Sequence, residues 1–135
     1  MPSISFEKLH VYQLAEKLSD ITWNTVSDWD YLAKSTVGTQ LIRAADSIGA
    51  NIAEGSGRGS FQDNRRFVKI ARGSLYEVRH WLRRAYARKL ITESQVQQLK
   101  PVIDELAPRL NAYINSIGPV TTTNTSDKCQ MPNAK

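Results

Sequence analysis

Residues 47–77 read SIGANIAEGSGRGSFQDNRRFVKIARGSLYE, and this stretch decides the fold. It joins the glycine-rich end of one predicted helix to a second helix with two unlike faces. At about 100° per residue, cations repeat along one line of the second helix, and apolar residues fill the opposite half. The apolar half requires a protein core. The basic line is about 27 Å long at a rise of about 1.5 Å per residue.

The two faces of this helix consist of different residue types. The basic rail, as we call the line, consists of Arg65, Lys69, Arg72, Tyr76, Arg79 and Arg83. The half that we expect in the core consists of Phe67, Ile70, Ala71, Ser74, Leu75, Val78, Trp81, Leu82 and Ala85. Such an amphipathic pattern is typical of a helix that packs on others.

Positive charge is concentrated in this helix. The 135-residue chain carries a net charge of +5, whereas residues 60–89 hold nine Lys or Arg against Asp63 and Glu77, a balance of +7. Because acidic residues are so few there, i,i+4 ion pairs do not explain the rail. We therefore expect a polyanion, above all a nucleic acid, to bind this face. A solvated helix face and an ionic interface with a protein stay open as alternatives.

Two helices are predicted before the basic one. The first covers about residues 5–26, with Ser5 as its N-cap, and a loop follows at 27–30. The second covers about residues 35–55 and is crowded with small side chains, which allow close approach of a neighbouring helix. Gly55 and Gly57 suit a left-handed turn at its C-terminal end. Strand signals are absent from the sequence.

The basic helix and a fourth helix complete the pattern. Ser60 caps the basic helix, which extends to about residue 89, and Gly73 inside it predicts tight packing against another helix. The fourth helix begins at Thr92, where TESQ forms a capping box, and it ends before residues 118–119. We expect a kink or a break at Pro101 and Pro108, since proline removes a helix donor.

These elements predict an all-α protein, an antiparallel four-helix bundle over residues 1–118. Residues 119–135, PVTTTNTSDKCQMPNAK, are polar and unpatterned, so we expect a disordered tail. The single cysteine, Cys129, falls in this tail and excludes an intrachain disulfide, and no metal-ligand set or cofactor motif is visible. Neither a signal peptide nor a membrane-spanning run is apparent, which predicts a cytoplasmic protein.

No enzyme motif occurs in the sequence. The run GSGRGS at residues 55–60 leads into a helix N-terminus, but it lacks the lysine of a P-loop, so we interpret it as a turn. Asn51, Glu54 and Arg58 are polar residues at this turn, and we expect them to satisfy helix-end groups and brace it. Catalysis by Glu54 is the alternative. The prediction is a protein that is not an enzyme.

Three motifs resemble a known family. QLIRAADSIGANIAEGSGRGS at residues 40–60, RFVKIARGSLYE at 66–77 and FEKLHVYQLA at 6–15 resemble the bacterial four-helix-bundle family named for proteins encoded in intervening sequences of 23S ribosomal RNA genes. The resemblance covers about residues 6–117. The positions that match its structural motif are Gln40, Arg43, Asn51, Glu54, Gly55, Gly57, Arg58, Gly73, Ser74 and Glu77.

The resemblance implies a function as well as a fold. The family includes the accessory variability determinant of diversity-generating retroelements, a basic pentamer that acts with nucleic acid and a reverse transcriptase. By this resemblance the chain is a homopentamer. The family's basic helical surface maps onto Arg65, Arg66, Lys69, Arg72, Arg79, Arg83 and Arg84. The chain departs from the family in its prolines, since the loop at 27–31 has none and the last helix has two.

The sequence therefore predicts a non-enzymatic, oligomeric protein that binds RNA or DNA. Lys and Arg of the rail would contact phosphates without strong readout of sequence, and Tyr76 could stack on an exposed base. The alternative is a protein-interaction scaffold, on which the rail docks an acidic partner such as a polymerase or a reverse transcriptase.

Overall fold

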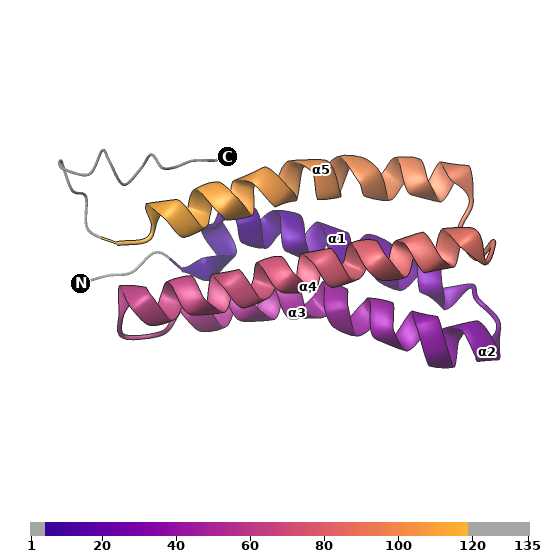
Figure 1. Ribbon diagram of the computed structural model, residues 1–135, viewed down its shortest axis with the longest axis horizontal. Helices are drawn as coiled ribbons and strands as arrows, with labels where there is room; N and C mark the ends of the chain where they lie inside the picture. Colours follow the sequence, from indigo (N-terminus) through magenta and orange to yellow (C-terminus); the bar gives the residue numbers. More distant parts are fainter. Residues whose placement is uncertain (1–4, 119–135) are drawn as a thin grey trace.

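The computed structural model describes residues 5–118, and within this range the chain forms helices and no strand. Four long helices account for most of it: α1 (His10–Ser27), α3 (Thr39–Ser56), α4 (Phe61–Ala87) and α5 (Glu93–Ser116). They lie side by side along the long axis of the molecule (Figure 1). The all-α prediction is confirmed for this range. The predicted disordered tail, residues 119–135, lies outside the described residues.

Three short elements adjoin the long helices. A 3₁₀ turn, η1 (Phe6–Lys8), precedes α1, while α2 (Tyr31–Ala33) and the π-helical turn η2 (Lys34–Gly38) lead into α3. Leu9 has an extended backbone and separates η1 from α1, so the single helix predicted for residues 5–26 is wrong at its start. The predicted N-cap is wrong too, because the Ser5 side chain makes no capping hydrogen bond.

The left-handed turn predicted at the end of α3 is also wrong. Gly55 is buried inside the helix, and Gly57 has a φ of −91°. The physical need for Gly55 is space. A Cβ atom there would lie 2.6 Å from Asn64 Oδ1 and 3.0 Å from Phe67 Cβ on α4. The missing side chain therefore lets α3 and α4 approach closely.

The N-caps of the last two helices are confirmed. Ser60 Oγ accepts the Asp63 N–H at 3.1 Å and begins α4. At the start of α5, Thr92 Oγ1 accepts the Gln95 N–H at 3.1 Å, and Gln95 Oε1 accepts the Thr92 N–H at 2.9 Å. This reciprocal pair is the predicted capping box.

Of the kink or break predicted in the last helix, the break is wrong. Helix α5 continues through Pro101 and Pro108 (Figure 1). Both prolines are exposed, whereas the helix buries Leu99, Leu106 and Leu110 on its opposite side. Burial of this apolar face outweighs the hydrogen bonds that the prolines remove, since helical stability in proteins comes mostly from tertiary packing.

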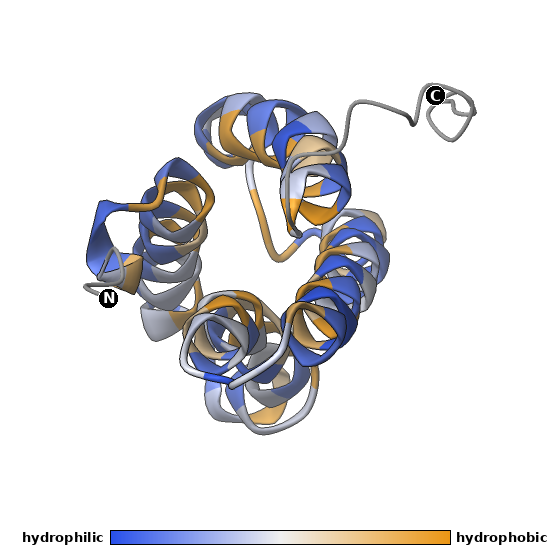
Figure 2. Ribbon diagram, turned by 90° about the vertical axis from the view of Figure 1, so that its left-hand side faces the viewer, coloured by the Kyte–Doolittle hydropathy of each residue, from blue (hydrophilic) through white to orange (hydrophobic). Residues whose placement is uncertain are grey.

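The core occupies the centre of the four helices, which surround it when seen along the long axis (Figure 2). Its largest fully buried aliphatic side chains are Leu18, Leu41, Ile48, Ile52, Leu75, Leu99, Leu106 and Leu110. Ile70 was predicted to be in the core and is 43% exposed. It points about 120° away from the direction of the buried residues Val68, Ala71 and Leu75 on the same helix.

The connections alternate between the two ends of the molecule. The α3–α4 turn lies at the same end as η1 and the end of α5, and the α1–α2 and α4–α5 connections lie at the other (Figure 1). Helix α4 packs far more extensively on α3 than on α5. The open side of α4, which faces away from the core, carries exposed residues along most of its length. Within residues 5–118, none of the helices combines the length and apolar character needed to cross a membrane.

Candidate nucleic-acid interface

The structure separates the basic rail into two groups, and the first group is engaged with α5. The Arg65 guanidinium donates to the Ile117 carbonyl oxygen at 2.7 Å, and that of Arg72 donates to Asn111 Oδ1 at 2.9 Å. Both arginines are half-buried. These two hydrogen bonds link the N-terminal half of α4 to the C-terminal part of α5 and the residue that follows it. The local sequence does not predict these two hydrogen bonds, because the acceptors lie 52 and 39 residues away from the arginines in the chain.

The second group faces solvent. Lys69, Tyr76, Arg79 and Arg83 are exposed, and Tyr76 has 58% of its surface accessible. Among residues 5–118, none of these four side chains has a hydrogen-bond or ion-pair partner. Their charges and the tyrosine ring are thus available to a ligand. We call Lys69, Tyr76, Arg79 and Arg83 the open rail.

Arg66 and Arg84 accompany the rail in different ways. Arg66 Nε lies 3.6 Å from Asp63 Oδ1, and its guanidinium carbon lies 4.6 Å from the centre of the Phe67 ring. This cation–π contact and the ion pair hold Arg66 near the start of α4. Arg84 is half-buried near the other end of the helix. Neither belongs to the open rail.

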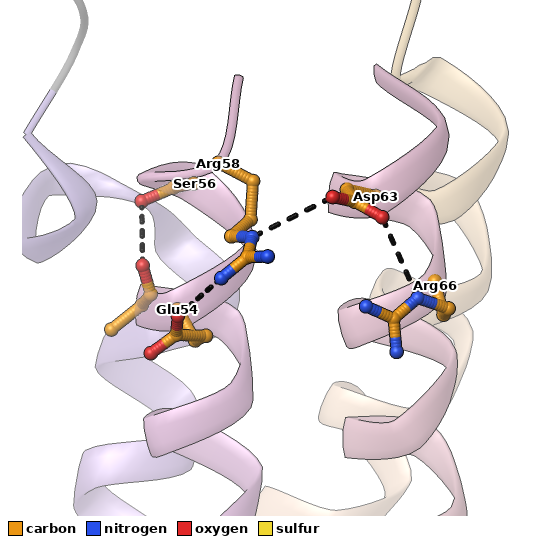
Figure 3. A network of polar contacts seen from close by, with 6 residues as sticks. Glu54, Ser56, Arg58, Asp63 and Arg66 are labelled. Carbon is orange, nitrogen blue, oxygen red and sulfur yellow. Dashed lines mark hydrogen bonds and ion pairs between the residues drawn. The ribbon is translucent and has the colours of Figure 1, made fainter. Parts of the chain in front are cut away.

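A chain of alternating charges braces the α3–α4 turn (Figure 3). Arg58 Nη1 lies 3.1 Å from Glu54 Oε2, and Arg58 Nε lies 3.6 Å from Asp63 Oδ2, which links the end of α3 to the start of α4. These residues line an open hollow of about 410 Å³. Because the three charged side chains are 39–53% exposed, the ion pairs contribute little stability each. The contacts are those of a brace, as the sequence predicts for Glu54 and Arg58.

Asn51 bonds within α3 to Ser47, the residue whose hydroxyl connects α3 to α4. Its Nδ2 donates to the Ser47 carbonyl oxygen at 2.8 Å and to Ser47 Oγ at 2.9 Å. Ser47 Oγ in turn lies 2.9 Å from Ser74 Oγ on α4. The motif residues Asn51 and Ser74 therefore meet in one half-buried polar network. This network differs from the predicted role of Asn51, which was to satisfy helix-end groups.

Gly73 does not have the packing role predicted for it. It is exposed on α4, and a Cβ atom added there would meet no atom within 4 Å. A glycine inside a helix costs about 0.5–1 kcal/mol relative to alanine. No contact within residues 5–118 accounts for this cost.

The remaining motif residues are exposed. Gln40 and Arg43 lie on the outer side of α3, and neither side chain forms a hydrogen bond to another described residue. Glu77 Oε2 on α4 accepts the Trp81 indole N–H at 3.2 Å. Across residues 5–118, no three His, Cys, Asp or Glu side chains gather where they could hold a metal ion.

Comparisons with known proteins add one finding to this geometry. The profile of a protein family described as 23S rRNA-intervening sequence protein matches residues 7–112. The match includes α1, α3 and α4 in full and α5 as far as residue 112, so it contains the open rail and the α3–α4 brace. A comparison with curated proteins finds no match.

Proposed function

Because this chain belongs to the family of 23S rRNA-intervening sequence proteins, we propose that it is a non-enzymatic, oligomeric protein that binds nucleic acid. The binding surface is the open rail of α4. The observation that carries the proposal is that three cations and a tyrosine of one helix face solvent without partners in the described chain. We take the fold to be an antiparallel four-helix bundle, in which the open side of α4 is accessible along its length.

Electrostatics explains how such a surface works. From Lys69 to Arg83 the open rail is about 21 Å long at the helical rise of about 1.5 Å per residue. Phosphates that bind to its Lys and Arg side chains release condensed counterions, which favours binding at low salt. These contacts position the strand and do not read its bases. Arg65 and Arg72 add positive potential nearby, although their guanidinium groups already donate to α5.

Assembly strengthens this effect. A homopentamer, as the family resemblance implies, would carry five times the net charge of +5 of one chain. Several copies of the open rail on one particle would also bind one strand together, which raises the effective concentration of each site. The proposal therefore joins oligomerisation to nucleic-acid binding in the cytoplasm.

A triple variant of the open rail tests the proposed function. We expect Lys69→Gln, Arg79→Gln and Arg83→Gln together to weaken binding of a fluorescent oligonucleotide at least about tenfold at low salt. With three phosphate contacts removed, the decrease of the logarithm of the binding constant with the logarithm of salt concentration should become less steep, by about 2 in slope for a single strand. Fluorescence anisotropy at several salt concentrations measures both. Arg72 stays unchanged because it donates to Asn111.

The matched control removes three charges elsewhere. Lys8, Lys17 and Lys34 are exposed and lie outside α4, so their replacement by Gln gives the same net charge with the open rail intact. Sedimentation equilibrium checks that both variants assemble like the wild type. Equal weakening by the two triple variants would contradict a specific site. If the wild type binds no nucleic acid at low salt, the acidic protein partner, such as a polymerase or a reverse transcriptase, becomes the leading hypothesis.

A further inference from the structure

Gly73 occupies the middle of the exposed face of α4. Its backbone is helical, and a side chain there would meet open space. An alanine would fit and would stabilise the helix, so neither backbone geometry nor packing within the described chain explains the glycine. Glycine is also the residue at which another molecule can approach a backbone most closely. This second explanation requires a ligand.

The neighbours of Gly73 on the helix surface differ on its two sides. At about 100° per residue, Lys69 and Tyr76 lie on the side toward the open rail, and Ile70 and Glu77 lie on the other. The Glu77 carboxylate accepts from Trp81, which holds it on its own side. A bare stretch of backbone is therefore bordered by an ammonium group and by a tyrosine ring that is 58% exposed.

We propose that a single-stranded nucleic acid crosses α4 at Gly73, with a base stacked on Tyr76 and phosphates on Lys69 and Arg79. This inference rests on the proposed function and names the class of nucleic acid. An exposed aromatic ring can stack on a base only where that base is unpaired and accessible. The absent Cβ lets the sugar and base lie against the helix, so that the Tyr76 ring and the Lys69 ammonium reach the same nucleotide.

Charge favours this occupant over a second copy of the chain. A symmetric contact between two α4 faces would bring the cations Lys69, Arg79 and Arg83 of each copy toward those of the other. Like charges opposed across an interface are unfavourable. A polyanion, in contrast, is attracted by all three.

The first variant separates binding from folding. Gly73→Ala should raise the urea midpoint of unfolding and weaken binding of fluorescent oligo(dT) and oligo(U) about tenfold, the scale of one lost stacking contact. Binding of a duplex of equal length should change much less. A gain in stability with a loss of affinity cannot result from misfolding. Gly59→Ala is the matched control, since a Cβ there also meets no atom within 4 Å but lies on the α3–α4 turn.

The second variant tests the aromatic contact. Tyr76→Ala should weaken single-strand binding about tenfold. Tyr86→Ala should leave it near the wild-type value, because Tyr86 lies on the same helix, is 54% exposed and donates its hydroxyl to Glu93 at 3.4 Å. Comparison of oligo(U) with oligo(dU), which differ only in the 2′-hydroxyl, shows whether this group contributes.

Each outcome has a distinct meaning. If Gly73→Ala and Tyr76→Ala leave salt-dependent binding unchanged while the open-rail triple variant loses it, the inference is wrong and the proposed function stands. Equal binding of single strand and duplex by the wild type would also overturn the inference. A change of particle mass on Gly73→Ala would place a second copy at this face instead. Absence of all binding at low salt would overturn both proposals.

Discussion

Gly55 on α3 and Gly73 on α4 show that glycine can occur in a helix for two different reasons. A Cβ atom at Gly55 would press on Asn64 and Phe67, whereas one at Gly73 would meet open space. Both glycines belong to the motif that the sequence predicts to be structural. The sequence distinguishes neither case, because the space around a Cβ depends on a helix that lies elsewhere in the chain.

The contact at Gly55 leads to a stability prediction. We expect Gly55→Ala to destabilise the fold by about 1–3 kcal/mol, because overpacking forces two helices apart. Asn64 Oδ1 is the nearest atom at 2.6 Å, but Phe67 Cβ at 3.0 Å and the Asn64 carbonyl oxygen at 3.1 Å can move away only if α4 itself shifts. Urea unfolding measures the loss.

Gly57→Ala is the control for this measurement. A Cβ atom there would be 3.7 Å from the Glu54 carbonyl oxygen, an ordinary contact. Its free energy of unfolding should stay close to that of the wild type. If Gly55→Ala unfolds at the same urea concentration as Gly57→Ala, the two helices can separate without loss, and the close approach is not needed for stability.

At the scale of the element, α4 shows how far local patterns extend. Its start at Ser60 and its length follow from capping and period, and these predictions agree with the structure within two residues. The helical period alone does not predict which residues of α4 face the core. The positions of the neighbouring helices α3 and α5 decide which residues are buried, so Ile70 points outward and Arg72 donates to Asn111. Such partners are distant in sequence.

Helix α5 offers a prediction at this same scale. Pro101→Ala and Pro108→Ala should each stabilise the protein by about 1 kcal/mol or more, because each restores a backbone donor inside a continuous helix. Both sites are exposed, so no core packing is lost. Thermal unfolding followed by circular dichroism measures the two singles and the double variant. The gains should add, since the sites lie two helical turns apart. Unchanged melting temperatures would mean that α5 accommodates the rings without strain.

At the scale of the whole molecule, a hydrogen bond between side chains joins the first long helix to the last. His10 Nε2 of α1 lies 3.0 Å from Glu105 Oε2 of α5, and Arg109 Nε lies 3.1 Å from the same oxygen. The hydrogen bond from His10, followed by that from Arg109, lowers the pKa of Glu105 below its ordinary value of 4.5. The sequence did not predict this pair, because α1 and α5 come together only in the folded chain.

The pair makes stability depend on pH. Because the pKa of Glu105 is lower in the folded than in the unfolded chain, its stabilising contribution is present above the unfolded pKa and is lost as pH falls through the folded pKa. Glu105→Gln should therefore be less stable than the wild type at weakly acid and neutral pH, and the difference should shrink at strongly acid pH. The effect is small because both side chains are about half exposed.

Urea unfolding over a range of pH measures this difference. In a His10→Gln background, the effect of Glu105→Gln should become smaller, since the main cause of the pKa shift is then missing. A difference between wild type and Glu105→Gln that stays constant down to strongly acid pH would show that the carboxyl group contributes no linkage at this site.

The overall shape follows from the sequence to the level of four helices and their order. What the sequence does not predict is the unequal packing around α4, which is extensive on α3 and slight on α5. The basic rail is divided at the contact with α5, because Arg65 and Arg72 donate to α5 residues, whereas Lys69, Tyr76, Arg79 and Arg83 are exposed. Helix periodicity predicts the direction in which each side chain points around the helix axis, but it does not predict how close the neighbouring helix lies.

The placement of the described ends has a consequence for protein engineering. The first and last described elements, η1 and the end of α5, lie at the same end of the molecule, and α1 packs on α5 (Figure 1). A flexible linker between these ends, with new termini opened at the α4–α5 connection, gives a circular permutant with the same helix contacts. Helix α4 then becomes the last element of the chain. A surface displayed on it can be lengthened or fused to another domain without interrupting the other helices.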